Sequence, residues 1–387
     1  MYFDDYQAGF HLFWLAFARP RLNQLKSRAE PRESGVMRIG EKIDFPATAR
    51  KLRAMIKYAK NTAGVTWDIK NCLRGAVPPP DLIVIEATRK LGENVLALPL
   101  VSALTASFPG SRVKLHDPDG NFPVPACVEK GGTGFDSEFN LRVRISFGGN
   151  CYFLKLGDDI VEITDLKDQY NGSSAYQREV AFPWWLWDRP TPDYSFPRMV
   201  FPEALARVSS AFSGQLSGPG KKIAFFIGSS DFYDQHHEDF SRIWGAEKFA
   251  RLAQLFCAEP PLDTKLFLLT GRSAAEKKAL DRVVRPLDFA PFFSRITPVA
   301  EATTTELYHL FQLMDLVISA DTGPAHLAYA SGAKTMVLVN KSIWQDGWYP
   351  PQNLVPNLEL FISPGLEDVD QIEPEDVACR AEHLGRI

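Results

Sequence analysis

The chain has 387 residues and a mass of 43.3 kDa, which corresponds to roughly two or three domains. Apolar residues account for 45% of the sequence and charged residues for 23%, as in ordinary globular proteins, so collagen, a coiled coil and overall disorder are excluded. The formal charge of −4 argues against a protein that binds nucleic acid through one large basic surface.

Cysteine usage and hydropathy both favour the cytoplasm. The five cysteines are odd in number and form no CxxC pair, which argues against a disulfide framework and against a cysteine metal site. No stretch approaches the ~18 apolar residues that cross a bilayer. The best candidate, residues 10–17, is too short and lacks the basic start and the cleavage site of a signal peptide.

Residues 1–79 form a basic segment, with 14 Lys and Arg against 7 Asp and Glu. Within it, residues 50–60 have the periodicity of a basic amphipathic helix. Such a helix either lies on an anionic membrane surface or docks on its own protein with the basic face in solvent. We therefore expect a helical extension, and peripheral contact with the inner membrane is one interpretation of it.

A βαβ pattern follows three consecutive prolines at 78–80. Residues 81–86 predict a buried strand, Gly92 a turn, residues 95–107 a helix and residues 112–115 a second strand. Further along, residues 182–198 are rich in aromatic residues and proline. Their tryptophans, Trp184, Trp185 and Trp187, either pack in the core or stack on sugar rings.

After a Gly- and Ser-rich linker at 213–220, short apolar strands alternate with helices. This alternation predicts a parallel, doubly wound sheet. We therefore predict an N-terminal domain over 80–215 and a C-terminal domain over 216–387. The predicted C-terminal strands are 222–227, 265–270, 316–320 and 335–339, and the helices are 246–257, 273–284, 304–314, 324–331 and 373–383.

The stretch 319–332, SADTGPAHLAYASG, follows a buried strand and opens a helix. Ligands of such folds bind at the carboxyl ends of the strands. Gly323 allows close approach to the backbone, and the N–H groups and dipole of the helix start suit a diphosphate. His326 falls in the first turn of this helix. The alternative is a purely structural turn in which Asp321 or Thr322 caps the helix.

Residues 321–340 resemble the signature of glycosyltransferase family 9, the heptosyltransferase-like enzymes. Three other stretches occur in the order that this family requires: FIGSS at 226–230, RIW with KF at 242–249, and LTG at 269–271. LGENV at 91–95 is similar to the Gly-Asp turn that follows the family's first strand. The resemblance spans about residues 81–360 and is strong in 221–348. The matching signature residues are Asp321, Thr322, Gly323, His326, Ala328 and Ala330.

The resemblance implies an α/β protein of the GT-B fold, in which two Rossmann-like domains face a central cleft. It also implies inverting, metal-independent transfer of heptose from ADP-heptose onto a lipopolysaccharide core or another glycan. The N-terminal domain would hold the acceptor and the C-terminal domain the nucleotide-sugar. The implied donor-binding residues are Ser229, Ser230, Arg242, Glu276, Asp321, Thr322, Gly323 and His326.

The sequence departs from the family at two points. Glu93 stands where the family has the Asp that removes the proton from the acceptor hydroxyl, and Gly245 stands where it usually has Pro. A carboxylate serves as general base in either form, but the reach of Glu93 differs by about 1 Å, and such a displacement can cost on the order of 100-fold in rate. The alternative for Glu93 is a surface carboxylate near a helix start.

Two interpretations of function therefore stand. In the first, Glu93 is the catalytic base of a glycosyltransferase that needs no metal cofactor. In the second, the chain is a non-catalytic GT-B scaffold that binds a nucleotide or a glycan. The pair His236-His237 has no third ligand at a credible spacing, so we interpret it as a polar loop and predict no metal site.

Overall fold

The structure is a computed structural model that describes parts of the chain between residues 74 and 384. None of the helices that it describes has the length and hydropathy needed to cross a membrane. The predicted extension over 1–79 lies almost wholly outside the described residues. The described ranges are 74–75, 77–117, 120, 122–124, 128–130, 138–146, 150–156, 159–163, 175–190, 192, 194–228, 242–258, 263–363 and 368–384.

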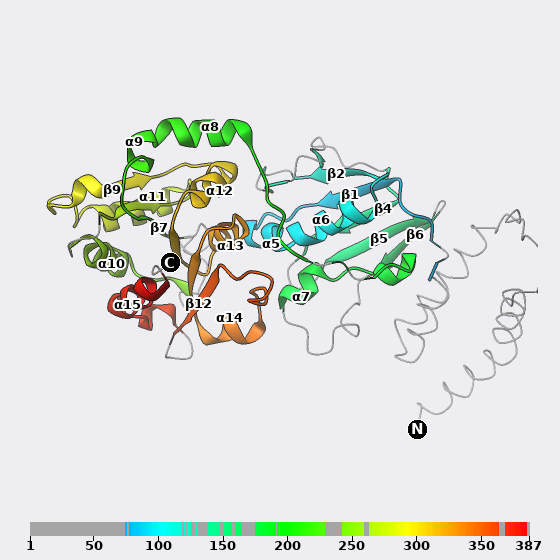
Figure 1. Cartoon of the computed structure of the whole chain (residues 1–387). Coiled ribbons are helices and arrows are strands. Elements are labelled where there is room, and N and C mark those ends of the chain that lie inside the picture. The colour runs from blue at the N-terminus through cyan, green and yellow to red at the C-terminus, as the bar shows by residue number, and fades with distance from the viewer. Residues whose placement is uncertain are drawn as a thin grey trace, which may run out of the picture. The chain divides into compact units, whose positions relative to one another are not determined.

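The first sheet has six strands in the order β3-β2-β1-β4-β5-β6 (Figure 1). β1 pairs in parallel with both β2 and β4, and β2 pairs in parallel with β3, while β5 and β6 extend one edge as an antiparallel hairpin. The predicted strands near 81–86 and 112–115 are confirmed. The strands are β1 (Leu82–Glu86), β2 (Arg112–His116), β3 (Glu129–Lys130), β4 (Leu141–Arg144), β5 (Cys151–Leu156) and β6 (Asp159–Ile163).

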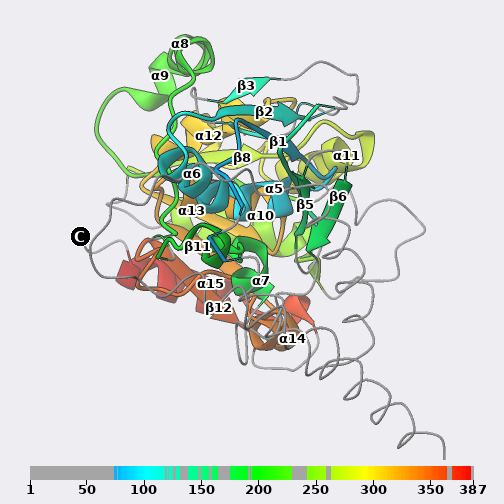
Figure 2. The ribbon, with the colours of Figure 1, turned by 90° about the vertical axis from the view of Figure 1, so that its right-hand side faces the viewer.

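The helix that follows β1 begins earlier than predicted. Residues 95–107 were expected to form one helix after a turn at Gly92, but α5 (Leu91–Leu96) already contains Gly92 and Glu93. A second helix, α6 (Leu98–Ser107), then packs along the first sheet (Figures 1 and 2). The two helices separate where Pro99 has no N–H to donate to the carbonyl of Val95.

The aromatic stretch packs mainly in the core. Trp184 is buried in the 3-10 helix η3 (Trp184–Trp187), and its Nε1 donates to the Tyr194 hydroxyl at 2.6 Å. Trp187 stacks on Phe182 with a centroid distance of 5.6 Å. These contacts favour the core interpretation of the tryptophans over sugar stacking. A short helix, α7 (Ala175–Val180), precedes this stretch.

The second sheet is entirely parallel, with the order β12-β11-β10-β7-β8-β9. This is the doubly wound order, in which the chain changes direction between the two central strands, here β7 and β10. The predicted parallel sheet is confirmed, although β9 and β12 were not predicted. The strands are β7 (Lys222–Phe226), β8 (Lys265–Leu269), β9 (Ile296–Val299), β10 (Leu316–Ala320), β11 (Thr335–Val339) and β12 (Leu358–Ile362).

Helices connect the strands of this sheet, and two of them begin with capping boxes. Ser273 and Glu276 cap α11 reciprocally, and Thr303 and Glu306 cap α12 in the same way. The helices are α10 (Ala246–Ala258), α11 (Ala274–Val284), α12 (Thr304–Gln312), α13 (Gly323–Ala330), α14 (Lys341–Asp346) and α15 (Pro374–Leu384), with 3-10 turns η6 (Phe293–Arg295) and η7 (Val369–Gln371).

The segment between the two sheets contains α8 (Pro202–Ala211), which lies against α12 (Figure 1). An ion pair of 2.6 Å joins Arg207 on α8 to Glu306 on α12. The predicted linker begins with one helical turn, α9 (Ser213–Leu216). Because α8 precedes residue 216 yet packs beside the second sheet, the domain boundary at 215/216 stays a prediction.

Candidate active site

A pocket of about 470 Å³ lies at the carboxyl ends of β7, β8 and β10. Phe226 contributes from β7, Arg272 from the turn after β8, and residues 321–323 from the turn after β10. Helix α5, which follows β1 of the first sheet, supplies another part of the lining. The pocket therefore lies at the direction change of the second sheet, where doubly wound folds bind their ligands.

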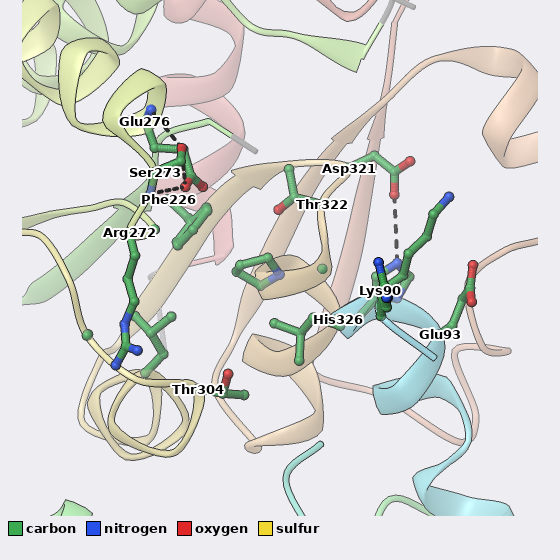
Figure 3. A pocket seen from close by; sticks show the side chains of 18 of the residues that line it. Lys90, Glu93, Phe226, Arg272, Ser273, Glu276, Thr304, Asp321, Thr322 and His326 are labelled. Atoms are coloured by element: carbon green, nitrogen blue, oxygen red, sulfur yellow. Dashed lines mark hydrogen bonds and ion pairs between the residues drawn. The ribbon is translucent and has the colours of Figure 1, made fainter. Parts of the chain in front are cut away.

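The pocket brings together most of the predicted site residues. Figure 3 shows Ser273 and Glu276 at one end, Glu93 and Lys90 at the other, and Asp321, Thr322 and His326 between them. Ser229, Ser230 and the pair His236-His237 lie outside the described residues. The predicted residues that line the pocket are Glu93, Arg242, Glu276, Asp321, Thr322, Gly323 and His326.

Asp321 is at the centre of a buried polar cluster. Its side chain is 7% exposed, and its Oδ2 lies 3.4 Å from Nη1 of Arg242. Its Oδ1 accepts a hydrogen bond from the Tyr349 hydroxyl and lies 3.8 Å from Nε2 of His326. Both carboxylate oxygens are thus held in fixed directions, one by a guanidinium and the other by a phenol.

His326 is neutral at physiological pH. Burial lowers the pKa of its imidazole to about 4, because desolvation outweighs the attraction of Asp321 and acts together with the repulsion of Arg242. Its Nδ1 lies 2.7 Å from the Tyr329 hydroxyl, and its ring stacks on Tyr349 with a centroid distance of 5.0 Å. His326 therefore contributes hydrogen bonding and packing to the pocket, without a positive charge.

The carboxylate of Glu276 lies directly over the backbone of Gly271. A Cβ at Gly271 would come within 2.4 Å of both Glu276 oxygens, so the carboxylate occupies the space that a side chain at position 271 would take. Oε2 of Glu276 also accepts from the Ser273 hydroxyl at 2.8 Å and from its N–H at 3.1 Å. Capping of α11 thus fixes a buried carboxylate in the wall of the pocket.

Glu93 reaches the pocket from the first turn of α5 and is 6% exposed. Two cations that the sequence analysis overlooked, Arg89 and Lys90, line the pocket just before this helix, and Arg272 lines it from the turn after β8. With Arg242, they give the described lining four cationic side chains against the carboxylates of Glu93, Glu276 and Asp321. The lining is therefore suited to an anionic ligand.

Glycines allow α5 and α13 to touch at the pocket. A Cβ at Gly323 would lie 2.9 Å from Cβ of Leu91 and 3.1 Å from the backbone nitrogen of Gly92. A Cβ at Gly92 would lie 3.1 Å from the His326 ring. The Asp-Thr-Gly turn of the second sheet is thus in direct contact with the helix that carries Glu93.

Gly323→Ala is expected to lower the midpoint of thermal unfolding by roughly 2–10 °C, because forcing a methyl group into a packed contact costs about 1–3 kcal/mol. Gly110→Ala is the matched control, since its added Cβ would meet nothing within 4 Å. Differential scanning calorimetry of both variants measures the effect. Equal midpoints for Gly323→Ala and the wild-type chain would contradict the contact between α5 and α13.

The Gly245 departure has a structural cause. The Gly245 N–H donates to Oδ1 of Asp370 at 2.9 Å, a bond that proline cannot make. Trp244 and Lys248, on either side, both donate to the carbonyl of Ile372, at 2.9 and 3.0 Å. The segment that carries Arg242 is therefore anchored on the chain before α15 in a way that requires a backbone N–H at 245.

Within the described ranges, no group of three or more His, Cys, Asp or Glu side chains is arranged to hold a metal ion.

Two aromatic residues of the loop after α14 also belong to the site. Trp348 lines the pocket, and Tyr349 contacts Asp321. Neither residue was singled out from the sequence, since 28 residues separate Tyr349 from Asp321.

Solved structures share this fold. The E. coli ADP-heptose lps heptosyltransferase II matches with a TM-score of 0.57 at 16% identity, covering 78% of this chain and 98% of its own. The glycosyl transferase family 9 protein of Veillonella parvula matches with a TM-score of 0.54 at 14% identity, covering 79% and 97%. E. coli heptosyltransferase WaaC with ADP matches with a TM-score of 0.50 at 13% identity, covering 78% and 99%. The predicted GT-B fold is confirmed.

The family comparison agrees with the sequence resemblance, although a search of curated proteins found no match. Residues 203–342 match the model of glycosyltransferase family 9 (heptosyltransferase). This range includes β7, β10 and the Asp-Thr-Gly turn at the start of α13. Residues 203–342, in the C-terminal half of the chain, are therefore similar to glycosyltransferase family 9, as the resemblance of residues 321–340 implied.

Proposed function

We propose that the chain is an inverting, metal-independent glycosyltransferase that moves heptose from ADP-heptose onto a lipopolysaccharide-core-like or other glycan acceptor. One observation carries this proposal: a single pocket is lined by Arg242 and the Asp-Thr-Gly turn of the second sheet and by Glu93 of the first. Two of the similar structures, an ADP-heptose lps heptosyltransferase and a heptosyltransferase with ADP, support the choice of donor.

In the proposed reaction, Glu93 is the general base. The acceptor hydroxyl gives its proton to the Glu93 carboxylate while its oxygen attacks the anomeric carbon of the donor sugar. The new glycosidic bond forms on the face opposite to the breaking bond, so the configuration inverts. The bonding electrons leave with the nucleoside diphosphate, which departs as the second product.

The diphosphate gains negative charge as the bond breaks. Arg242 is the proposed partner for this charge, because a guanidinium binds phosphate oxygens in a bidentate manner. The backbone N–H groups at the start of α13, near Thr322 and Gly323, are proposed to donate to the same diphosphate. Ser229 and Ser230 remain proposed donors to it. Asp321 and Glu276 supply the carboxylates that would accept hydroxyl groups of the donor.

A panel of nucleotides is the first test of the proposed donor. We expect ADP to stabilise the chain against thermal unfolding and ADP-heptose to stabilise it more, since a ligand at 100 times its Kd adds about 2.7 kcal/mol. UDP, GDP and CMP serve as controls for the base. If another nucleotide raised the unfolding temperature more than ADP, the proposed donor would change to a sugar conjugate of that nucleotide. If none of them raised it, the result would contradict the proposed function.

Contact with the inner membrane is a separate part of the proposal. The basic segment 1–79 is proposed to bring the chain to an anionic surface where lipid-linked acceptors lie. Co-sedimentation of the full chain with vesicles that contain anionic lipid, compared with neutral vesicles, measures this contact. Equal sedimentation with both would exclude an electrostatic contact.

A further inference from the structure

The three residues after α14 connect the first sheet to the pocket. The carbonyl of Gly347 accepts the N–H of Tyr176, on α7, at 3.0 Å. Trp348 packs against a small apolar cluster that contains Leu96 of α5 and Tyr176. Tyr349, the next residue, is buried and contacts Asp321 of the pocket lining. The position of Tyr349 is therefore set by contacts with helices of the N-terminal sheet.

Tyr349 contacts two residues of the family signature at once. Its hydroxyl donates to Oδ1 of Asp321, and its ring lies parallel to that of His326, with an interplanar angle of 9°. Burial, followed by the charge of Asp321, raises the pKa of the Tyr349 phenol well above its usual value. The phenol therefore keeps its proton at physiological pH and acts as a hydrogen-bond donor.

We propose that Tyr349 is a positioning residue: its hydroxyl fixes the orientation of the Asp321 carboxylate, and the contacts of Gly347 and Trp348 with α7 and α5 hold Tyr349 in place. The partner of Asp321 in turnover is the donor sugar, and in this respect the proposal rests on the proposed function. The contact between the two side chains exists without any ligand, so it is testable on its own.

The other neighbours of Asp321 indicate how the Tyr349 hydroxyl affects the orientation of the carboxylate. Arg242 faces Oδ2 at 3.4 Å, while Oδ1 faces the Tyr349 hydroxyl and Nε2 of His326, at 3.8 Å. Tyr329 in turn contacts the far nitrogen of the imidazole. Without the Tyr349 hydroxyl, Oδ1 would lose its phenol donor and could move closer to Nε2 of His326. The carboxylate would then leave the direction it has in the wild-type pocket.

The ligand-free test is a titration of His326 by NMR of the histidine-labelled full chain. Tyr349→Phe keeps the stacked ring and removes only the hydroxyl. We expect it to raise the pKa of His326 above its wild-type value of about 4, because the carboxylate then interacts with the imidazolium. In Tyr349→Phe combined with Asp321→Asn, the rise should be absent. An unchanged pKa in Tyr349→Phe would overturn the proposal.

The matched control removes another buried tyrosine hydroxyl. Tyr152 is fully buried in the first sheet, and its hydroxyl donates to the carbonyl of Ala181, away from the pocket. Tyr152→Phe should leave the His326 titration unchanged. A rise in this variant equal to that in Tyr349→Phe would show a general loss of packing and would overturn the specific role of Tyr349.

The test with ligand is a double-mutant cycle on ADP-heptose binding, measured by calorimetry. Tyr349→Phe should weaken binding about tenfold, but in the Asp321→Asn background it should add no further loss, because the hydroxyl acts through the carboxylate. Independent, multiplying losses would overturn the proposal. If the wild-type chain binds no nucleotide-sugar, the proposed function fails, and the His326 titration still decides whether Tyr349 positions Asp321.

Discussion

Glu93→Gln is expected to reduce the rate of sugar transfer by about 10²- to 10⁴-fold, which is the usual contribution of a general base. The amide matches the carboxylate in size but does not take up the acceptor proton. Glu93 reaches the pocket from α5, whereas Arg242 and the turn at Thr322 and Gly323, which are proposed to face the diphosphate, belong to other segments. The affinity for ADP should therefore stay within about twofold of the wild-type value. Steady-state release of ADP, together with calorimetric binding of ADP, measures both quantities.

Two further variants sharpen this result. Glu93→Asp restores the residue of the family pattern but withdraws the carboxylate, and such a misplacement can cost on the order of 100-fold. Glu129→Gln is the control, because Glu129 lies on the surface of the same sheet in an exposed 3.3 Å pair with Arg112. Full turnover by Glu93→Gln would remove Glu93 as base. A wild-type chain that binds ADP-heptose but transfers nothing would support the non-catalytic scaffold.

The parts of the site that could be predicted from the sequence are those built from neighbouring residues. Asp321 and Thr322 lie in the turn after β10, and Gly323 and His326 lie in the first turn of α13, so their order along the chain already places them together. A short apolar strand followed by Gly and Pro is a local signal. For the same reason, β10 and β11 were predicted with their observed bounds.

Contacts between distant segments could not be predicted in this way. Tyr349 reaches Asp321 only because the loop after α14 returns to the end of β10, and no periodicity marks this return. The start of α5 was placed too late because Gly92 was interpreted as a turn residue. In the structure, Gly92 is instead part of the helix and leaves little room beside His326 of α13, since an added Cβ would lie 3.1 Å from the imidazole ring. The contact between α5 and α13 therefore outweighs the preference of glycine for turns, and Gly92 lies in a helix.

The two departures from the family pattern differ in how far they argue against catalytic activity. Gly245 is explained by the N–H that it donates to Asp370, so it does not argue against activity. Glu93 remains the departure that bears on function, because its carboxylate lines the pocket. The choice between a glycosyltransferase and a non-catalytic scaffold thus depends on two features of the pocket. One is the reach of the Glu93 carboxylate, and the other is the positive charge of Arg242 that is proposed to face the leaving diphosphate.

Arg242→Met is expected to weaken ADP binding by about 10- to 100-fold, since each hydrogen bond between charged groups contributes roughly 1.5–3 kcal/mol and 1.4 kcal/mol corresponds to a factor of ten. Arg242 lies 3.4 Å from Asp321 and is 30% exposed, so its guanidinium is already held at the pocket. Arg242→Lys should recover part of the affinity, because lysine keeps the charge but lacks the bidentate geometry. Isothermal titration calorimetry at constant salt measures all three chains.

The control for Arg242 is Arg251 on the nearby helix α10, which pairs with a carboxylate away from the pocket. Arg251 lies 2.9 Å from Glu375, and both side chains are about half exposed. Such surface pairs contribute about 0–1 kcal/mol, so Arg251→Met should leave ADP binding unchanged. If Arg242→Met bound ADP as tightly as Arg251→Met, the diphosphate would not be held by Arg242. The charge of the leaving group would then have to be met by the start of α13 or by Arg89, Lys90 and Arg272, which line the same pocket.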